Sequence, residues 1–134
     1  MEKIKILIVD DDPEIASSIK GMLNEAGYET RSVSDGEEGL RELKKFRPAV
    51  VLLDLMLPGS SGFKIAQVIK SLDEFKDTPL IAVSFKKDAV DKHVAAKSGI
   101  ADYLEKPVDK EMLLAHLKEI LGQNGSNGDT SPIK

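Results

Sequence analysis

Two short apolar runs, each ending in aspartate, constrain the fold of this chain more than any other feature. Residues 4–9, Ile-Lys-Ile-Leu-Ile-Val, precede three consecutive aspartates, and residues 50–53, Val-Val-Leu-Leu, precede Asp54. Each run has the length and the β-branched content of a strand buried in a parallel sheet. Ligands bind such sheets at the carboxyl ends of the strands, where the strand order reverses. The sequence therefore predicts an α/β fold with carboxylates gathered at that edge.

Carboxylates at one sheet edge repel one another unless a cation holds them together. Asp10, Asp11 and Asp12 follow the first run, and Asp54 follows the second. A hard divalent cation with oxygen ligands suits such a cluster, and Mg²⁺ is the first candidate. The sequence thus predicts a Mg²⁺ site beside Asp54.

Strand-like and helix-like segments alternate along the whole chain. Asp12-Pro13 is typical of a helix start, and Gly27 is typical of a helix end. The predicted strands are residues 4–9, 28–33, 49–53, 79–83 and 102–104, and the predicted helices are residues 13–26, 36–46, 63–72, 88–98 and 110–121. Five such units predict a doubly wound five-stranded parallel sheet of flavodoxin-like type, and right-handed crossovers favour the strand order 2-1-3-4-5.

Composition narrows the class of protein further. A chain of 134 residues with 41% hydrophobic content is long enough for one domain with its own core. A net charge of −4 argues against non-specific binding of nucleic acid. The absence of cysteine excludes disulfides and thiolate metal sites. No apolar stretch reaches the roughly 20 residues of a membrane span, and the N-terminus leaves no room for a signal peptide, so we expect a cytoplasmic protein without membrane contact.

The last 13 residues, 122–134, differ in composition from the rest of the chain. They contain Gly, Asn and Ser with almost nothing apolar to bury. We therefore expect a domain over residues 1–121, followed by a flexible tail or the start of a linker.

Polar groups fall at four predicted strand ends that lie side by side. They are the aspartates at 10–12, Asp54, Ser84 and Lys106. A carboxylate that attacks phosphorus requires neutralisation of its own charge and of the donor's charge. A divalent cation and a lysine supply positive charge, and a hydroxyl can donate to a phosphoryl oxygen. The set is therefore complete for forming an aspartyl phosphate.

These residues also resemble a known family. Asp10-Asp11, Asp54, Ser84 and Lys106-Pro107, in this order and on these strands, resemble the receiver domain of bacterial two-component response regulators. The resemblance covers residues 3–121. It implies a signalling switch rather than an enzyme acting on other molecules. Such a switch takes a phosphoryl group from a phosphohistidine of a sensor histidine kinase or a histidine phosphotransfer protein, and then hydrolyses it slowly.

The resemblance assigns roles around the phosphoacceptor. It implies that Asp54 receives the phosphoryl group, and that the side chains of Asp11 and Asp54 bind Mg²⁺. The carbonyl of Met56 would be a backbone ligand, and Asp10 would act largely through water.

The resemblance also assigns the switch residues. Lys106 would pair with the phosphoryl group, Ser84 would report it through its hydroxyl, and Tyr103 would be the aromatic switch. The bond before Pro107 would be cis. The output surface would comprise the fourth helix, the fifth strand and the fifth helix, a face that can also form a homodimer. The output protein or domain is not identified by the sequence.

Four positions depart from the family pattern. Ser61 stands where aspartate is common, Ile100 replaces a usual alanine, and Val108 replaces a common phenylalanine. Phe85 follows Ser84 where the family usually has a small residue. We expect the Phe85 ring either to fold over the mouth of the site, which we favour, or to turn outward into the partner surface.

Several of these residues also have a purely structural explanation, and other protein classes share parts of the pattern. Asp12 is better explained as a helix N-cap than as a ligand, Ser84 is a common strand-end residue, and Tyr103 fits a core position equally well. A phosphatase of the haloacid-dehalogenase type would need an aspartate where Met56 stands. A flavodoxin-like electron carrier would need a Ser-, Thr- and Gly-rich loop in place of the three aspartates. A degenerate receiver, which acts as an interaction module without phosphorylation, stays open as the alternative.

Overall fold

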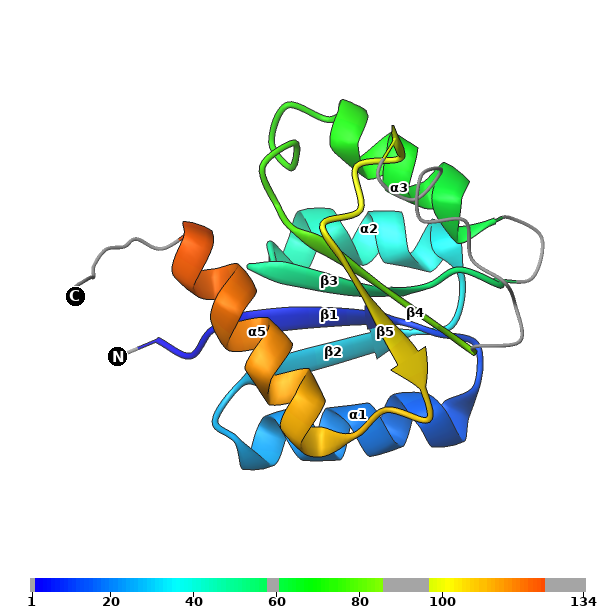
Figure 1. Cartoon of the computed structure of the whole chain (residues 1–134). Helices are drawn as coiled ribbons and strands as arrows, with labels where there is room; N and C mark the ends of the chain where they lie inside the picture. Colours follow the sequence, from blue (N-terminus) through cyan, green and yellow to red (C-terminus); the bar gives the residue numbers. More distant parts are fainter. Residues whose placement is uncertain (1, 58–60, 86–96, 125–134) are drawn as a thin grey trace.

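The computed structural model describes residues 2–57, 61–85 and 97–124, which form one α/β sandwich (Figure 1). In chain order its elements are β1 (Lys5–Val9), α1 (Pro13–Glu25), β2 (Glu29–Val33), α2 (Gly36–Phe46), β3 (Val50–Asp54), α3 (Gly62–Ser71), β4 (Leu80–Phe85), β5 (Asp102–Lys106) and α5 (Lys110–Asn124). Residues 88–96 of the predicted fourth helix lie outside the described residues.

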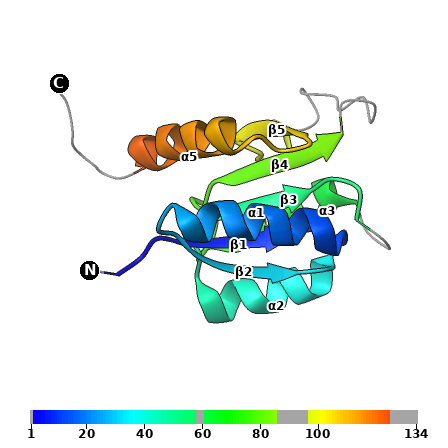
Figure 2. The same ribbon diagram turned by 90° about the horizontal axis from the view of Figure 1, so that it is seen from below.

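The sheet has the predicted order. Its five strands are parallel and run β2-β1-β3-β4-β5. Helices α1 and α5 cover one face, and α2 and α3 cover the other (Figures 1 and 2). The doubly wound architecture is therefore confirmed. Its switch point lies between β1 and β3, where successive crossovers go to opposite sides.

Each face of the sheet has its own apolar core because successive side chains of a strand point to opposite faces. In β3, Val51 and Leu53 pack with the α2–α3 side, whereas Val50 and Leu52 pack with the α1–α5 side. All five residues of β3 are buried. This double burial explains why the strand is a continuous apolar run rather than an alternating one.

The helix boundaries follow the local signals that the sequence contains. Asp12 caps α1 by accepting hydrogen bonds from the backbone N–H groups of Glu14 and Ile15, and proline occupies the first turn. After α1, Gly27 adopts a φ of +100°, which glycine tolerates best. These hydrogen bonds show that Asp12 caps α1. Its presence beside the other acids therefore needs no role as a metal ligand.

Three elements run further than the sequence pattern predicts. β4 continues through Ser84 to Phe85, and β5 continues through Glu105 to Lys106. The two strands stay in register at these positions because backbone pairing does not depend on apolar side chains. Helix α5 continues to Asn124, and residues 125–134 of the predicted tail lie outside the described residues.

In the described part of the chain, no helix is long and apolar enough to cross a membrane.

Candidate functional site

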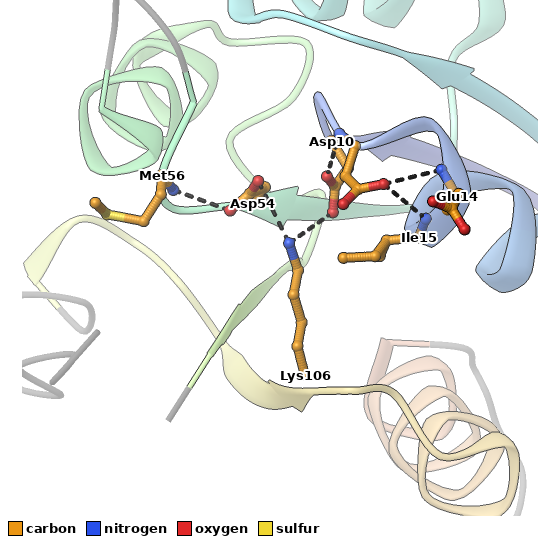
Figure 3. Close-up of polar contacts among 7 residues, drawn as sticks. Asp10, Glu14, Ile15, Asp54, Met56 and Lys106 are labelled. Atoms are coloured by element: carbon orange, nitrogen blue, oxygen red, sulfur yellow. Dashed lines mark hydrogen bonds and ion pairs between the residues drawn. The ribbon is translucent and has the colours of Figure 1, made fainter. Parts of the chain in front are cut away.

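Three strands bring two acids and one lysine together at the carboxyl edge of the sheet. Asp10 directly follows β1, Asp54 ends β3, and Lys106 ends β5. Their exposed fractions are 4%, 4% and 6%. β4 lies between β3 and β5, so the long side chain of Lys106 reaches across it toward the two acids (Figure 3).

Lys106 contacts both buried carboxylates. Its Nζ lies 2.9 Å from Oδ2 of Asp10 and 3.4 Å from Oδ2 of Asp54. The other oxygen of each acid accepts a backbone hydrogen bond. The N–H of Asp12 donates to Oδ1 of Asp10, and the N–H of Met56 donates to Oδ1 of Asp54, each at 2.9 Å. The backbone and one ammonium thus hold both carboxylates in place.

Burial and charge shift two pKa values in this cluster. Burial raises the pKa of Asp54, and the nearby charge of Asp10 adds to this, against the hydrogen bond from Met56 and the charge of Lys106. Burial alone would lower the pKa of Lys106, but its hydrogen bond to Asp10 and the charges of both acids outweigh burial and raise it. Lys106 therefore stays an ammonium at neutral pH and keeps a positive charge beside the buried Asp54 carboxylate.

A third acid completes the cluster. Ligand oxygens of Asp10, Asp11 and Asp54 all lie within 4.8 Å of one another, and Asp11 is exposed. Three carboxylates against one ammonium leave two negative charges in a small volume. Hard carboxylate oxygens are the donors that Mg²⁺ prefers, and the residual charge matches a divalent ion. The residues present therefore fit the metal that the sequence predicts.

The remaining predicted residues come from β4, from β5 and from the segments that follow β3 and β5. Ser84, 1% exposed, follows Val83, which is the register partner of Asp54. The side chain of Met56 is 64% exposed while its backbone contacts Asp54. Tyr103 is half-buried and packs against the α2–α3 core cluster. The Lys106–Pro107 bond is cis.

Gly62 shapes the site, although the sequence did not single it out for this. A Cβ atom placed there would lie 2.4 Å from the backbone oxygen of Asp54 and 2.6 Å from Cα of Leu55. The first turn of α3 therefore packs directly against the end of β3. The sequence signal that could have revealed this contact is a glycine at the start of a helix, eight residues after Asp54.

Phe85 lies at the site. Its ring centroid is 5.2 Å from Nζ of Lys106, and its exposed fraction is 38%. The ring thus contacts the lysine of the site, but Phe85 does not line the groove that reaches Asp10 and Asp11, so the expected position over the mouth of the site stays a prediction.

A groove of about 490 Å³ between α1 and the end of β2 reaches Asp10 and Asp11. It is lined by Asp10, Asp11, Ser17, Lys20, Ser34 and Glu38, among others. This side of the cluster, with the buried Asp10 and the exposed Asp11, is thus open to solvent.

Comparison with known proteins identifies the family. The family described as response regulator receiver domain matches residues 6–118. This chain belongs to it. Receiver domains are signalling domains of two-component systems, so the family match decides against the phosphatase and the electron carrier considered above.

Curated relatives of the chain include a DNA-binding response regulator and a transcriptional regulatory protein. This chain is 35% identical over 120 residues to the DNA-binding response regulator MtrA of Mycolicibacterium smegmatis. The aligned part covers 90% of this chain and 51% of MtrA. It is also 33% identical over 116 residues to the transcriptional regulatory protein AfsQ1 of Streptomyces coelicolor. That alignment covers 87% of this chain and 50% of AfsQ1. The chain thus spans about half the length of the curated relatives it matches.

Solved receiver structures share the fold. A putative response regulator from Chloroflexus aurantiacus superposes with a TM-score of 0.85 at 32% identity, covering 90% of this chain and 98% of its own. The receiver domain of a sensor histidine kinase from Pseudomonas aeruginosa superposes with a TM-score of 0.81 at 28% identity, covering 90% and 98%. That domain has a magnesium ion coordinated in its active site cleft.

Proposed function

We propose that this receiver accepts a phosphoryl group on Asp54 from a phosphohistidine of a sensor histidine kinase or a histidine phosphotransfer protein. The observation that carries the proposal is the pairing of a buried Asp54 carboxylate with the buried Lys106 ammonium, at 3.4 Å, beside two further acids. A structural aspartate at a strand end needs neither a buried lysine nor additional acids.

In the transfer, an oxygen of Asp54 attacks phosphorus in line with the bond between phosphorus and the histidine nitrogen. The new O–P bond forms as the N–P bond breaks, and its electron pair stays on the imidazole of the donor. The N–H of Met56, which donates to Asp54, keeps the carboxylate oriented for this attack. Lys106 balances charge on Asp54 before transfer and is close enough to follow the phosphoryl oxygens afterwards.

Asp10, Asp11 and Asp54 would hold Mg²⁺, with the carbonyl of Met56 as a backbone ligand and Asp10 acting largely through water. A bound Mg²⁺ would neutralise the charge that develops on the phosphoryl oxygens. Support for this set comes from the gathering of the three carboxylates and from their fit to a hard cation.

The phosphoryl group, with a charge of about −2, would then recruit the switch residues. Ser84 would pair with it through its hydroxyl, and Tyr103 would follow, altering the output surface expected from the sequence, of which β5 and α5 are the described part. That surface would bind an output protein, an output domain or a second copy of the chain. Slow hydrolysis of the aspartyl phosphate by this same domain, in the cytoplasm, would reset the switch.

The alternative is a receiver that binds partners without being phosphorylated. Intact mass spectrometry after incubation with acetyl phosphate and Mg²⁺ separates the two functions. We expect one phosphoryl adduct on the wild type and on Asp73→Asn, a control at an exposed aspartate, and none on Asp54→Asn. An adduct that persists on Asp54→Asn would place the phosphoacceptor elsewhere, and no adduct on any protein would favour the unphosphorylated module.

A further inference from the structure

Phe85 ends β4 at the same edge of the sheet as the acids. Residues 80–84 of this strand are buried, whereas Phe85 is partly exposed. Its register partner on β5 is Lys106. Because side chains alternate along a strand, Phe85 shares a sheet face with Val83, which packs in the α1–α5 core cluster. The ring therefore borders the site from the α1–α5 side.

The ring makes a cation–π contact with the ammonium of Lys106. The 5.2 Å between Nζ and the ring centroid lies within the roughly 6 Å over which the ring quadrupole attracts a cation. The contact is stronger where the cation is shielded from water, and the Lys106 side chain is only 3% exposed. Nζ therefore has three neighbours that favour its charge: Asp10, Asp54 and the Phe85 ring.

The surroundings of Phe85 leave room for other side chains. Its ring borders a mostly apolar groove of about 190 Å³, which is also lined by Ile15, Ile19, Pro107 and Val108. Val108 is smaller than the phenylalanine common at that place in the family. Substitutions of Phe85 by residues of similar size are therefore expected to fold, which makes the contact testable.

We propose that Phe85 is a positioning residue of the phosphoryl site: its ring face holds the Lys106 ammonium against Asp10 and Asp54 and so stabilises the site before it is loaded. The proposal rests on Asp54 as the phosphoacceptor. The oxygens that Lys106 holds belong to the same carboxylates that a metal ion and the phosphoryl group require. A contact that favours the unloaded arrangement opposes both loading steps, and its removal eases both.

Three substitutions separate the electrostatic effect of the ring from its bulk. Phe85→Leu keeps an apolar side chain of comparable size but removes the π face, Phe85→Tyr keeps the ring, and Phe85→Ala removes both. Two measurements apply to each protein: the Mg²⁺ dissociation constant, from titration of backbone amide NMR signals, and the initial rate of labelling by acetyl phosphate, from intact mass.

We expect Phe85→Leu to bind Mg²⁺ more tightly and to label faster, by between roughly 2-fold and roughly 30-fold, the factors that correspond to about 0.5 to 2 kcal/mol. Phe85→Tyr should keep the wild-type values, and Phe85→Ala should resemble Phe85→Leu. A purely steric role predicts the opposite pattern, with Phe85→Leu like the wild type and only Phe85→Ala faster. That pattern, or equal changes in the Leu and Tyr variants, overturns the proposal.

The two proposals fail in different ways. If the wild type gains no adduct at Asp54, the phosphoacceptor proposal fails, and the Mg²⁺ titration alone then decides the role of Phe85. Thermal melting in chelator checks that each variant folds, and Phe85→Met replaces Phe85→Leu as the non-aromatic variant if the leucine protein does not.

Discussion

Replacing Lys106 by methionine tests whether this lysine is the cation that makes the acid cluster tolerable. Methionine keeps the length and much of the volume of the side chain but carries no charge. In the variant, Asp10 and Asp54 keep their backbone hydrogen bonds but lose the ammonium that lies 2.9 Å and 3.4 Å from their Oδ2 atoms. Both carboxylates are 4% exposed, so water replaces the lost ammonium poorly.

The expected cost follows from this burial. Removing one partner of a buried ion pair destabilises a protein by about 3–5 kcal/mol, because the other charge stays buried without compensation. For a domain of this size, 1 kcal/mol moves the melting temperature by roughly 4 °C. In chelator, Lys106→Met should therefore melt about 12–20 °C below the wild type.

Saturating Mg²⁺ should recover most of this loss, because a bound divalent ion neutralises the same carboxylates. The increase in melting temperature on adding Mg²⁺ should thus be larger for Lys106→Met than for the wild type, as measured by calorimetry or circular dichroism. Lys118→Met, at an exposed position of α5, is the matched control and should stay within about 0.5 kcal/mol of the wild type. Equal melting of Lys106→Met and the wild type in chelator would refute the assigned role, as would equal stabilisation of both by Mg²⁺.

Three further predictions concern two acids of this cluster and the glycine that packs against the end of β3. Asp11→Ala should weaken Mg²⁺ binding in an NMR titration and melt above the wild type in chelator, because one of three mutually repelling acids is gone; unchanged affinity would contradict the metal site. Because the folded-state pKa of Asp54 is raised, its ionised form costs stability above that pKa, and the cost disappears as the pH falls toward the usual 3.8. Asp54→Asn should therefore be more stable than the wild type to urea at pH 7, with a difference that shrinks as the pH falls through this range; a difference independent of pH would contradict the shift. Gly62→Ala should lose about 1–3 kcal/mol in urea unfolding, because its Cβ would meet backbone atoms of Asp54 and Leu55; wild-type stability would contradict this close packing.

The strand order and the gathering of the acids could be predicted from the sequence because both depend on local, repetitive signals. The run before Asp54 is apolar throughout, and the run before Asp10 is apolar from Ile6 to Val9, which identifies central strands of a parallel sheet. Once these strands are parallel neighbours, their carboxyl ends must coincide. The start of α1 is marked by the local capping hydrogen bonds of the Asp12 side chain and by Pro13, and its end is marked by the backbone preference of Gly27.

The ends of β4 and β5 could not be predicted in the same way. Ser84 and Glu105 interrupt the apolar pattern, yet their backbones remain paired in the sheet. The contacts of Lys106 are also invisible in the sequence, because they depend on a side chain from β5 crossing β4 to reach acids on β1 and β3. The resemblance pointed to its future partner, the phosphoryl group, but not to Asp10, its nearest partner in the unloaded site.

The same lysine links the chemistry of the site to the surface around it. Its ammonium contacts Asp10, Asp54 and the Phe85 ring at once. A change in the charge of either acid therefore changes the position that the ammonium prefers among the three. If Asp54 gains a phosphoryl group, one carboxylate charge is replaced by about two on the phosphoryl oxygens, and the ammonium is drawn toward them. Phe85 then loses part of its contact at the end of β4, where its ring also borders the groove between α1 and Val108. Phosphorylation of Asp54 would thereby affect the molecular surface at Phe85 through the side chain of Lys106. This route does not involve Ser84 or Tyr103.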